Sequence, residues 1–297
     1  MNIVTPEPRA FAVVGGDLRQ VCLARQLAAD RHEVFTYANE AREHSAADKS
    51  IKEVAHPSAL PKGCVVVLPL PAVAEGGLLS APLSKVKISI NELLDTLAPG
   101  TPVMAGMVKE DLARAAAERG LRLVDYFERE ELAVANAAAT AEAAIALAAD
   151  NLPVTLGTSR ALVVGFGRIG KLLTLGLRGL GCRVSASARK YEDLAWIEAF
   201  GARAVRTESV ADIAQDYDVI FNTVPARVLC RDALERVKRD AVVIDLASKP
   251  GGLDFDAARE LGVNVIWALS LPGKTSPITA GAIIRDSIYN ILYDGGI

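Results

Sequence analysis

The chain alternates between short apolar runs and longer amphipathic segments along its whole length. Apolar runs rich in Val, Ile and Phe predict buried strands, and the segments between them have the residue spacing of helices. In the first half, strands are expected at residues 11–14, 33–37, 65–68, 103–105 and 122–125, with helices that include 19–29 and 109–119. Such alternation is typical of α/β proteins with parallel sheets.

An alanine-rich segment, residues 128–150, predicts one long helix between two halves of the chain. Its small side chains suit a tightly packed helix between domains, and Pro153 ends it. A second series of strands is expected at 161–164, 183–187, 219–222, 242–245 and 263–268, with helices that include 171–180, 194–200 and 255–260. A Gly- and Pro-rich loop over 270–277 and a last helix over 280–292 complete the pattern.

We therefore predict an α/β fold of two doubly wound, Rossmann-like domains around a cleft. The first domain is expected to span residues 1–150 and to end in the alanine-rich helix, and the second to span 151–297. The last helix is expected to pack back on the first domain.

The composition excludes several classes of protein. With 297 residues, 51% of them hydrophobic and 23% charged, the chain can bury a large core and is not a disordered protein. A net charge of −3 argues against a dedicated nucleic-acid binder. The N-terminus shows no signal-peptide pattern, and no uninterrupted apolar stretch reaches the length of a membrane span. We expect a cytoplasmic protein with neither a membrane nor a nucleic acid as partner.

Cysteine and histidine usage narrows the chemistry further. The four cysteines (Cys22, Cys64, Cys182 and Cys230) are scattered without a C-x-x-C pair, so neither a metal site nor a disulfide framework is predicted. We expect them to be small buried apolar residues. The three histidines (His32, His44 and His56) all lie in the first fifth of the chain. A histidine acid or base from the second half is therefore excluded.

The strongest motif is Gly165-Phe-Gly167-Arg-Ile-Gly170, which follows a predicted strand and opens a predicted helix. In a dinucleotide-binding turn, the glycines allow a tight turn, close approach of the pyrophosphate and close packing of helix on strand. The helix N-terminus then offers free N–H groups to the phosphates. We predict that Gly165, Gly167, Arg168, Ile169 and Gly170 bind a dinucleotide.

The strand after this motif indicates which dinucleotide is bound. An NAD site usually carries an acidic residue about 20 residues after the glycines, at the end of the second strand. Here that position holds Ser187, Arg189 and Lys190, and no acid appears before Glu192. Because Arg pairs strongly with phosphate, we predict that these three residues bind a 2′-phosphate and that the cofactor is NADP.

Three further loops follow strands of the second half and are expected at the same edge of the sheet. They contribute Asn222, Thr223 and Pro225, then Ser248 and Lys249, and finally Lys274. We place these residues near the nicotinamide half of the cofactor, where the two lysines could hold an anionic substrate.

The first half has its own strand-end loop, Gly15-Gly-Asp17-Leu-Arg19-Gln20. An Asp within it would repel phosphate, so we do not expect a second dinucleotide site. In a two-domain dehydrogenase this loop would face the cleft, where Asp17 and Arg19 could contact substrate. An Asp that only caps the following helix is the other interpretation.

These segments together resemble the A subunits of dipicolinate synthase from spore-forming bacteria. The resemblance rests above all on the GGD-x-RQ opening combined with Asp245-Leu-Ala-Ser-Lys-Pro-Gly-Gly252, and it extends to Leu271-Pro-Gly-Lys274. It departs from the pattern at Thr140–Ala143, where a Glu-Gly pair is usual, and at Ile278, where a Lys is usual.

The resemblance implies oxidation of a dihydrodipicolinate by NADP⁺ to pyridine-2,6-dicarboxylate, the last step of dipicolinate formation in the mother cell during sporulation. It also implies a partner, the flavoprotein-like B subunit, and we expect a homo-oligomer. We assign the dicarboxylate to Lys249, Lys274 and Arg19, with Asp17 as proton acceptor. The alternatives are a D-2-hydroxyacid dehydrogenase-like oxidoreductase and a non-catalytic NADP-binding regulatory subunit.

Overall fold

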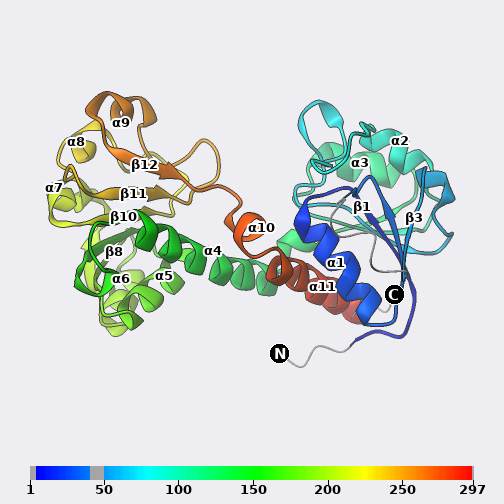
Figure 1. Cartoon of the computed structure of the whole chain (residues 1–297), viewed down its shortest axis with the longest axis horizontal. Helices are drawn as coiled ribbons and strands as arrows, with labels where there is room; N and C mark the ends of the chain where they lie inside the picture. The colour runs from blue at the N-terminus through cyan, green and yellow to red at the C-terminus, as the bar shows by residue number, and fades with distance from the viewer. Residues whose placement is uncertain (1–4, 41–49, 296–297) are drawn as a thin grey trace. The chain divides into compact units, whose positions relative to one another are not determined.

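The computed structural model describes residues 5–40 and 50–295, which form two compact units (Figure 1). The first unit contains Met1–Asn136 and Gly273–Ile297, and the second contains Ala137–Pro272. The division falls inside helix α4 (Glu130–Asn151) and not at its end. The reason is that α4 contributes Leu132 to the core of the first unit and Ala144 and Ala148 to the core of the second.

The first unit is built on a six-stranded parallel sheet with the strand order β3-β2-β1-β4-β5-β6. Its strands are β1 (Ala10–Val14), β2 (Glu33–Tyr37), β3 (Ile51–Glu53), β4 (Val65–Val67), β5 (Pro102–Ala105) and β6 (Arg122–Asp125). The apolar runs predicted all of them except β3, whose three residues include two charged ones. The order reverses between β1 and β4, which is the doubly wound arrangement.

Helices cover both faces of this sheet. On one face lie α1 (Leu18–Ala29) and α11 (Pro277–Asp294), which run side by side (Figure 1), and on the other lie α2 (Ile90–Asp95) and α3 (Glu110–Glu118). The alternation of β1 follows this division, since Phe11 and Val13 pack toward α1 and Ala12 and Val14 toward α2 and α3. The last helix thus packs within the first unit.

The second unit repeats this architecture with the strand order β12-β11-β10-β7-β8-β9, again all parallel. Its strands are β7 (Arg160–Val164), β8 (Arg183–Ala188), β9 (Arg203–Arg206), β10 (Val219–Asn222), β11 (Val242–Asp245) and β12 (Asn264–Trp267). The order reverses between β7 and β10, so the crevice for a ligand lies outside the carboxyl ends of these two strands.

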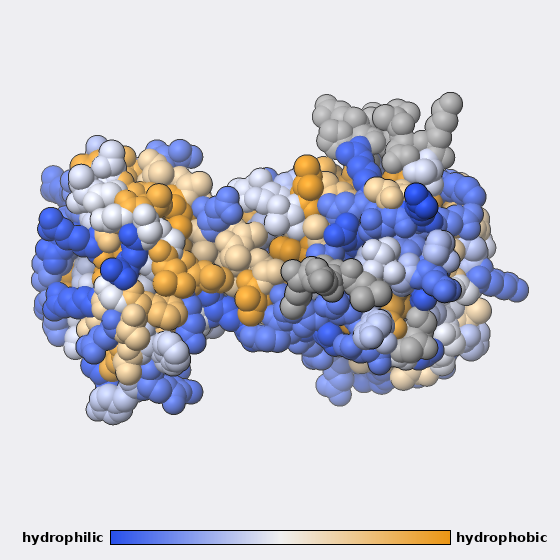
Figure 2. All heavy atoms as spheres, turned by 90° about the horizontal axis from the view of Figure 1, so that it is seen from below, coloured by the Kyte–Doolittle hydropathy of each residue, from blue (hydrophilic) through white to orange (hydrophobic). Residues whose placement is uncertain are grey.

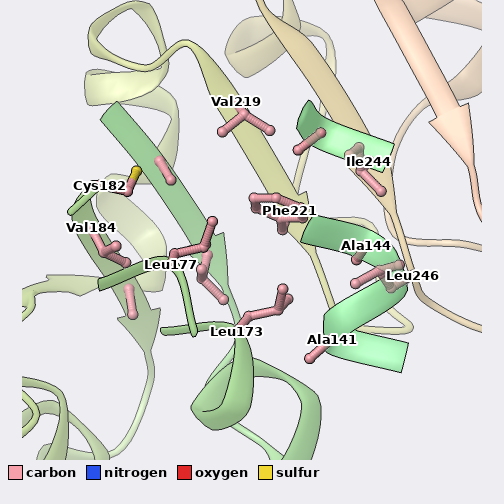
Figure 3. Close-up of a cluster of buried hydrophobic side chains, with 14 of the residues drawn as sticks. Ala141, Ala144, Leu173, Leu177, Cys182, Val184, Val219, Phe221, Ile244 and Leu246 are labelled. Carbon is pink, nitrogen blue, oxygen red and sulfur yellow. The ribbon is translucent and has the colours of Figure 1, made fainter. Parts of the chain in front are cut away.

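One face of the second sheet is covered by α4, α5 (Arg168–Gly179) and α6 (Tyr191–Ala199). Figure 3 shows this core, where Leu173 and Leu177 of α5 and Ala144 of α4 meet Phe221 of β10. The other face is covered by α7 (Val210–Ile213), α8 (Arg231–Leu234) and α9 (Phe255–Leu261). Both faces of the strands are therefore buried, as in other parallel sheets.

The segment before the last helix differs from expectation. Residues Leu271–Thr275 form a short helix, α10, where we expected a loop, and α11 begins at Pro277 and not near residue 280. A proline is well tolerated in the first turn of a helix, because its missing N–H would have no partner there. Pro277 therefore begins the helix. Short 3₁₀ turns complete the described chain at Pro57–Ala59, Glu75–Gly77, Tyr126–Glu128, Leu156–Thr158, Thr207–Ser209 and Ala214–Asp216.

The cysteines are free thiols, and Cys64 and Cys182 are buried as expected, whereas Cys22 and Cys230 are half-buried. Burial raises the pKa of the Cys64 thiol to about 11. Among the described residues no group of three or more His, Cys, Asp and Glu side chains could hold a metal ion. One described helix, α4, is long and apolar enough to cross a membrane by length and composition, but its Ala144 and Ala148 lie in a protein core. Apolar side chains on the visible surface of Figure 2 lie in small groups among polar ones.

Candidate functional site

The turn between β7 and α5 has the geometry of a dinucleotide-binding loop. Gly165 has a φ of +95°, and a Cβ on it would lie 2.5 Å from the Oγ1 of Thr223. A Cβ on Gly170 would lie 2.1 Å from the carbonyl oxygen of Gly165. Both positions therefore require glycine, the first for the turn and the second for packing of helix on strand.

Gly167 is different, because a Cβ there would meet nothing within 4 Å. It is the N-cap residue of α5, no side chain caps the helix at this residue, and the first turn holds no acidic residue. The N–H groups of this turn and the positive end of the helix dipole are thus open to an anion. Gly167 is exposed, Arg168 is exposed and Ile169 is half-buried against the core. The space beside Gly167 fits a pyrophosphate, which is the group that a dinucleotide would place there.

At the carboxyl end of β8, the three residues assigned to the 2′-phosphate have different surroundings. Ser187 is fully buried, and its Oγ lies 3.4 Å from the N–H of Gly165, whose main hydrogen bond goes to the Ser187 carbonyl at 3.1 Å. Arg189 and Lys190 are exposed, and Lys190 pairs with Glu192 at 3.2 Å. The structure therefore leaves Arg189 and Lys190 accessible to a ligand, whereas Ser187 supports the glycine turn from below.

The loop after β10 borders the glycine turn. The N–H and the Oγ1 of Thr223 both donate to the carbonyl oxygen of Val164, at 2.9 and 3.0 Å, so Thr223 is fixed against the end of β7. Asn222 is fully buried, and Pro225 is exposed. Of these three residues, the structure leaves Pro225 and part of Thr223 accessible, while Asn222 faces inward.

The loop after β11 is held by a residue that the sequence patterns did not single out, Asp245. Its buried carboxylate accepts hydrogen bonds from the side chain of Asn222 at 2.7 Å and from the backbone N–H groups of Ala247 and Gly252 at 3.1 and 2.9 Å. Ser248 and Lys249, which follow, are exposed. Lys249 forms no ion pair or hydrogen bond with the residues that the structure describes.

In the first unit, Asp17 and Arg19 form an ion pair at the start of α1. The Asp17 carboxylate caps the helix through the N–H of Arg19 at 3.0 Å and also accepts from the Arg19 side chain. Nε donates to Oδ1 at 2.9 Å and Nη2 to Oδ2 at 2.8 Å, while Nη2 also donates to the carbonyl oxygen of Leu70 at 2.6 Å. Capping and side-chain pairing thus occur together, and Arg19 joins the loops that follow β1 and β4.

The neighbouring Gln20 and Tyr126 complete this loop cluster. Both are buried, and both donate to the carbonyl oxygen of Leu68, at 3.1 and 2.9 Å. Burial raises the pKa of the Tyr126 hydroxyl above its usual range, so this group stays a neutral donor. The strand ends of the first unit are therefore cross-linked by side chains rather than left open for a nucleotide.

Arg19 also lies next to the residue that precedes Lys274. A Cβ on Gly273 would lie 3.0 Å from Nε of Arg19, so this guanidinium requires the glycine beside it. Lys274 is exposed and has no hydrogen bond or ion pair within the described part of the chain. The structure thus brings Arg19 and Lys274 together in the first unit, whereas Lys249 belongs to the second.

Comparison with sequence families agrees with this division. Residues 10–127 match the family of N-terminal domains of the dipicolinate synthase A subunit. Residues 133–250 match the family described as "D-isomer specific 2-hydroxyacid dehydrogenase, NAD binding domain". The second match covers the glycine turn and most of the loop after β11. The predicted nicotinamide dinucleotide site and the Rossmann-like fold are confirmed, and the chain is an oxidoreductase.

Whole-chain relatives agree as well. The A subunit of dipicolinate synthase from Bacillus subtilis (strain 168) is 29% identical over 286 residues, which covers 95% of each chain. The crystal structure of the corresponding A subunit from Bacillus halodurans matches with a TM-score of 0.85 and 27% identity, covering 96% of this chain and 97% of that one. A transhydrogenase from Sinorhizobium meliloti, at a TM-score of 0.69, 17% identity and coverage of 96% and 94%, shares the fold.

The resemblance predicted from the sequence is thereby confirmed over both units. The chain is similar to A subunits of dipicolinate synthase over nearly its whole length, and its residues 10–127 belong to the family of N-terminal domains of these subunits.

Proposed function

We propose that the chain catalyses the NADP-dependent oxidation of a dihydrodipicolinate to dipicolinate, as the A subunit of a two-subunit dipicolinate synthase. The observation that carries this proposal is the glycine turn of Gly165, Gly167 and Gly170, in a chain similar to dipicolinate synthase A subunits. The oxidation removes a hydride and a proton from the dihydropyridine ring. The bound cofactor would accept the hydride, and the proton would leave to a base or to water.

The choice of NADP over NAD rests on the end of β8. Arg189 and Lys190 are both exposed there, and neither is preceded on the strand by an acidic residue that would bind a ribose 2′-hydroxyl. A guanidinium can bind a phosphate through two parallel hydrogen bonds. We assign the 2′-phosphate to these two side chains, and we assign Ser187 to support of the glycine turn because it is buried.

The substrate's two carboxylates are assigned to Arg19 and Lys274 of the first unit and to Lys249 of the second. Arg19 and Lys274 lie at one edge of their sheet, and Lys274 has no anionic partner in the described chain. Lys249 follows β11, on the side of the crevice where the nicotinamide half of a dinucleotide binds. Aromatisation favours the reaction strongly, so orientation of the ring contributes more than a strong base.

Asp17 has a different part from the one expected of it. Its two carboxylate oxygens already accept hydrogen bonds from the guanidinium and the backbone N–H of Arg19. A carboxylate engaged in this way is better suited to orient Arg19 than to accept a substrate proton. We therefore propose Asp17 as a positioning residue and assign proton acceptance to no side chain.

The match to a 2-hydroxyacid dehydrogenase domain raises the alternative of keto-acid reduction. That reaction needs a proton donor near the nicotinamide, and histidine is the usual one. All three histidines of this chain lie at or before residue 56, so the second unit has none. The dihydrodipicolinate reaction, which requires no strong acid, is therefore the better candidate.

The wider assignments are proposals of the same kind. A second, flavoprotein-like subunit is implied by the name of the relatives, and self-association stays a prediction. The same relatives suggest a cytoplasmic location in the mother cell during sporulation.

The absorbance of NADPH at 340 nm tests the proposal. Purified chain, NADP⁺ and dihydrodipicolinate are mixed with and without the candidate partner subunit, and a rise at 340 nm above the uncatalysed rate is expected. The Gly167→Val variant is the control, because it should not bind the cofactor. If wild-type chain binds NADP⁺ but produces no NADPH in either mixture, the chain is a non-catalytic nucleotide-binding subunit.

A further inference from the structure

Asp245 occupies an unusual place for an acidic residue. It ends a central strand, β11, and its side chain is completely buried. No cationic side chain in the described chain pairs with it; its donors are one amide and two backbone N–H groups. A buried carboxylate without a counterion is costly unless its oxygens are well hydrogen-bonded, and here both oxygens are.

These hydrogen bonds connect two loops that follow neighbouring strands. Oδ1 accepts from Asn222, at the end of β10, and from Ala247 in its own loop, while Oδ2 accepts from Gly252. Asn222 in turn donates to the carbonyl oxygen of Val224 at 3.0 Å and accepts from the Val224 N–H at 3.3 Å. The Asp245–Asn222 pair therefore sets the path of both the 222–225 loop and the 246–252 loop.

The two glycines after the loop are shaped around this pair. A Cβ on Gly251 would lie 2.9 Å from Oδ2 of Asp245, and a Cβ on Gly252 would lie 1.9 Å from the side-chain nitrogen of Asn222. The carbonyl oxygen of Gly252 accepts the N–H groups of Val228 and Leu229 at 3.0 and 3.2 Å. The loops are thus joined at both ends, with Asp245 at their centre.

The exposed residues carried by these loops are those assigned to the nicotinamide side. Ser248 and Lys249 lie on one loop and Thr223 and Pro225 on the other, and none of them touches Asp245 through a hydrogen bond. The turn that would bind the pyrophosphate is separate, since it is built from Gly165–Gly170 and from the end of β8. Removing the Asp245 carboxylate should therefore disturb one half of the dinucleotide site and leave the other in place.

We propose that Asp245 is a positioning residue that holds the two nicotinamide-side loops together for binding of the whole dinucleotide. This rests on the proposed function only in that the second unit binds a nicotinamide dinucleotide. An Asp245→Asn substitution keeps the shape of the side chain but turns one acceptor into a donor. That donor must face Gly252, Ala247 or Asn222, all of which are donors themselves.

The test compares whole dinucleotides with fragments that lack the nicotinamide half. Binding of NADPH, NADH, 2′,5′-ADP and ADP is measured by calorimetry for the wild type, Asp245→Asn and the matched control Asp254→Asn. Asp254 is an acid in the same unit that caps α9 through the N–H of Ala257 at 3.0 Å, a task that Asn also performs. We expect Asp245→Asn to weaken the preferred dinucleotide ten-fold or more, to leave its fragment within two-fold, and the control to match the wild type.

Two results would overturn the inference. Unchanged affinity of the variant for the dinucleotide would show that the loops keep their places without the carboxylate. Equal loss for dinucleotide and fragment would show that Asp245 supports the whole unit. If Asp245→Asn does not fold, Asn222→Ala, which removes the same hydrogen bond from the other loop, must show the same selective loss. Wild-type chain that binds neither dinucleotide would instead refute the proposed function.

Discussion

The carboxylate of Asp17 holds the guanidinium of Arg19 through two side-chain hydrogen bonds, from Nε to Oδ1 at 2.9 Å and from Nη2 to Oδ2 at 2.8 Å. The Arg19 side chain is only 12% exposed, so its charge is oriented and largely withdrawn from water. Buried, hydrogen-bonded ion pairs fix geometry better than exposed ones do. This pair explains why an Asp and an Arg both occur in the loop after β1.

If Arg19 binds a substrate carboxylate, loss of the Asp17 charge should weaken substrate binding indirectly. For Asp17→Asn we expect the KM for dihydrodipicolinate to rise several-fold, with little change in the affinity for NADP. The ion pair of Asp95 with Arg119, 2.7 Å apart and more exposed, provides the control in the same unit. Steady-state kinetics on Asp17→Asn and Asp95→Asn would contradict the assignment if both variants gave the wild-type KM.

The glycine turn gives a pair of substitutions with opposite consequences. A side chain at Gly167 meets open space, so Gly167→Val should fold normally and lose dinucleotide binding, because it fills the place of the pyrophosphate. A Cβ at Gly170 would collide with the carbonyl oxygen of Gly165, so Gly170→Ala should lower the free energy of unfolding, by roughly 1–3 kcal/mol. Thermal melting and calorimetry distinguish the two. A Gly167→Val protein with wild-type affinity would mean that this loop is only a turn.

Cofactor preference should depend on Arg189. An Arg189→Asp variant replaces the proposed partner of the 2′-phosphate by an acid that can bind a ribose hydroxyl. We expect the Kd for NADPH to rise ten-fold or more and the Kd for NADH to fall. Arg183, at the opposite end of β8 and also exposed, is the matched control, and Arg183→Asp should change neither constant. Equal NADPH affinity in both variants would remove Arg189 from the site.

Much of this site could be predicted from the sequence, because its signals are local. The apolar runs marked β7, β10 and β11, and the spacing of Gly165, Gly167 and Gly170 indicated the nucleotide turn. The short strands β3 and β9 were missed because both mix charged with apolar residues. The Leu271–Thr275 helix was missed because its Pro and Gly predict a loop.

The inward-facing side chains could not be predicted in the same way. Residues of β8 are buried on both faces of the sheet, so no alternation showed that Ser187 faces inward while Arg189 is exposed. The role of Asp245 depends on Asn222, which is 23 residues away in the sequence and adjacent only through the pairing of β10 with β11. Such a contact needs the register of two strands, which sequence patterns do not supply.

The two exposed lysines allow a direct test of the dicarboxylate assignment. Lys274→Met and Lys249→Met keep the length and apolar part of the side chain but remove the charge. We expect each to raise the KM for dihydrodipicolinate ten-fold or more, a loss of about 1.4 kcal/mol of binding, with the Kd for NADP nearly unchanged. Lys85→Met, a lysine of the first unit outside the proposed site, is the control. If KM and kcat stay at wild-type values in both variants, the substrate binds elsewhere.

His32 makes the stability of the first unit dependent on pH. Its ring is buried between Phe11 and Tyr289, with centroid distances of 4.9 and 5.5 Å, and its Nδ1 accepts from the N–H of Arg9 at 3.3 Å. Burial lowers the pKa of this imidazole below 6.5; nearby Asp30 opposes the shift and Arg9 adds to it. The folded protein thus keeps His32 neutral at a pH where the unfolded chain binds a proton.

The sign of the effect follows from this difference in proton binding. Above pH 6.5 His32 is neutral in both states and its contribution is complete; as the pH falls from there toward the lowered folded pKa, the unfolded state gains protons first and stability is lost. The contribution of one residue is at most about 1.4 kcal/mol per pH unit. His32→Phe, which keeps a ring between Phe11 and Tyr289, should flatten this part of the profile, whereas His56→Gln at an exposed 3₁₀ cap should not. Urea unfolding between pH 5 and 8 measures the slopes, and identical slopes in the wild type and His32→Phe would exclude His32 as the titrating group.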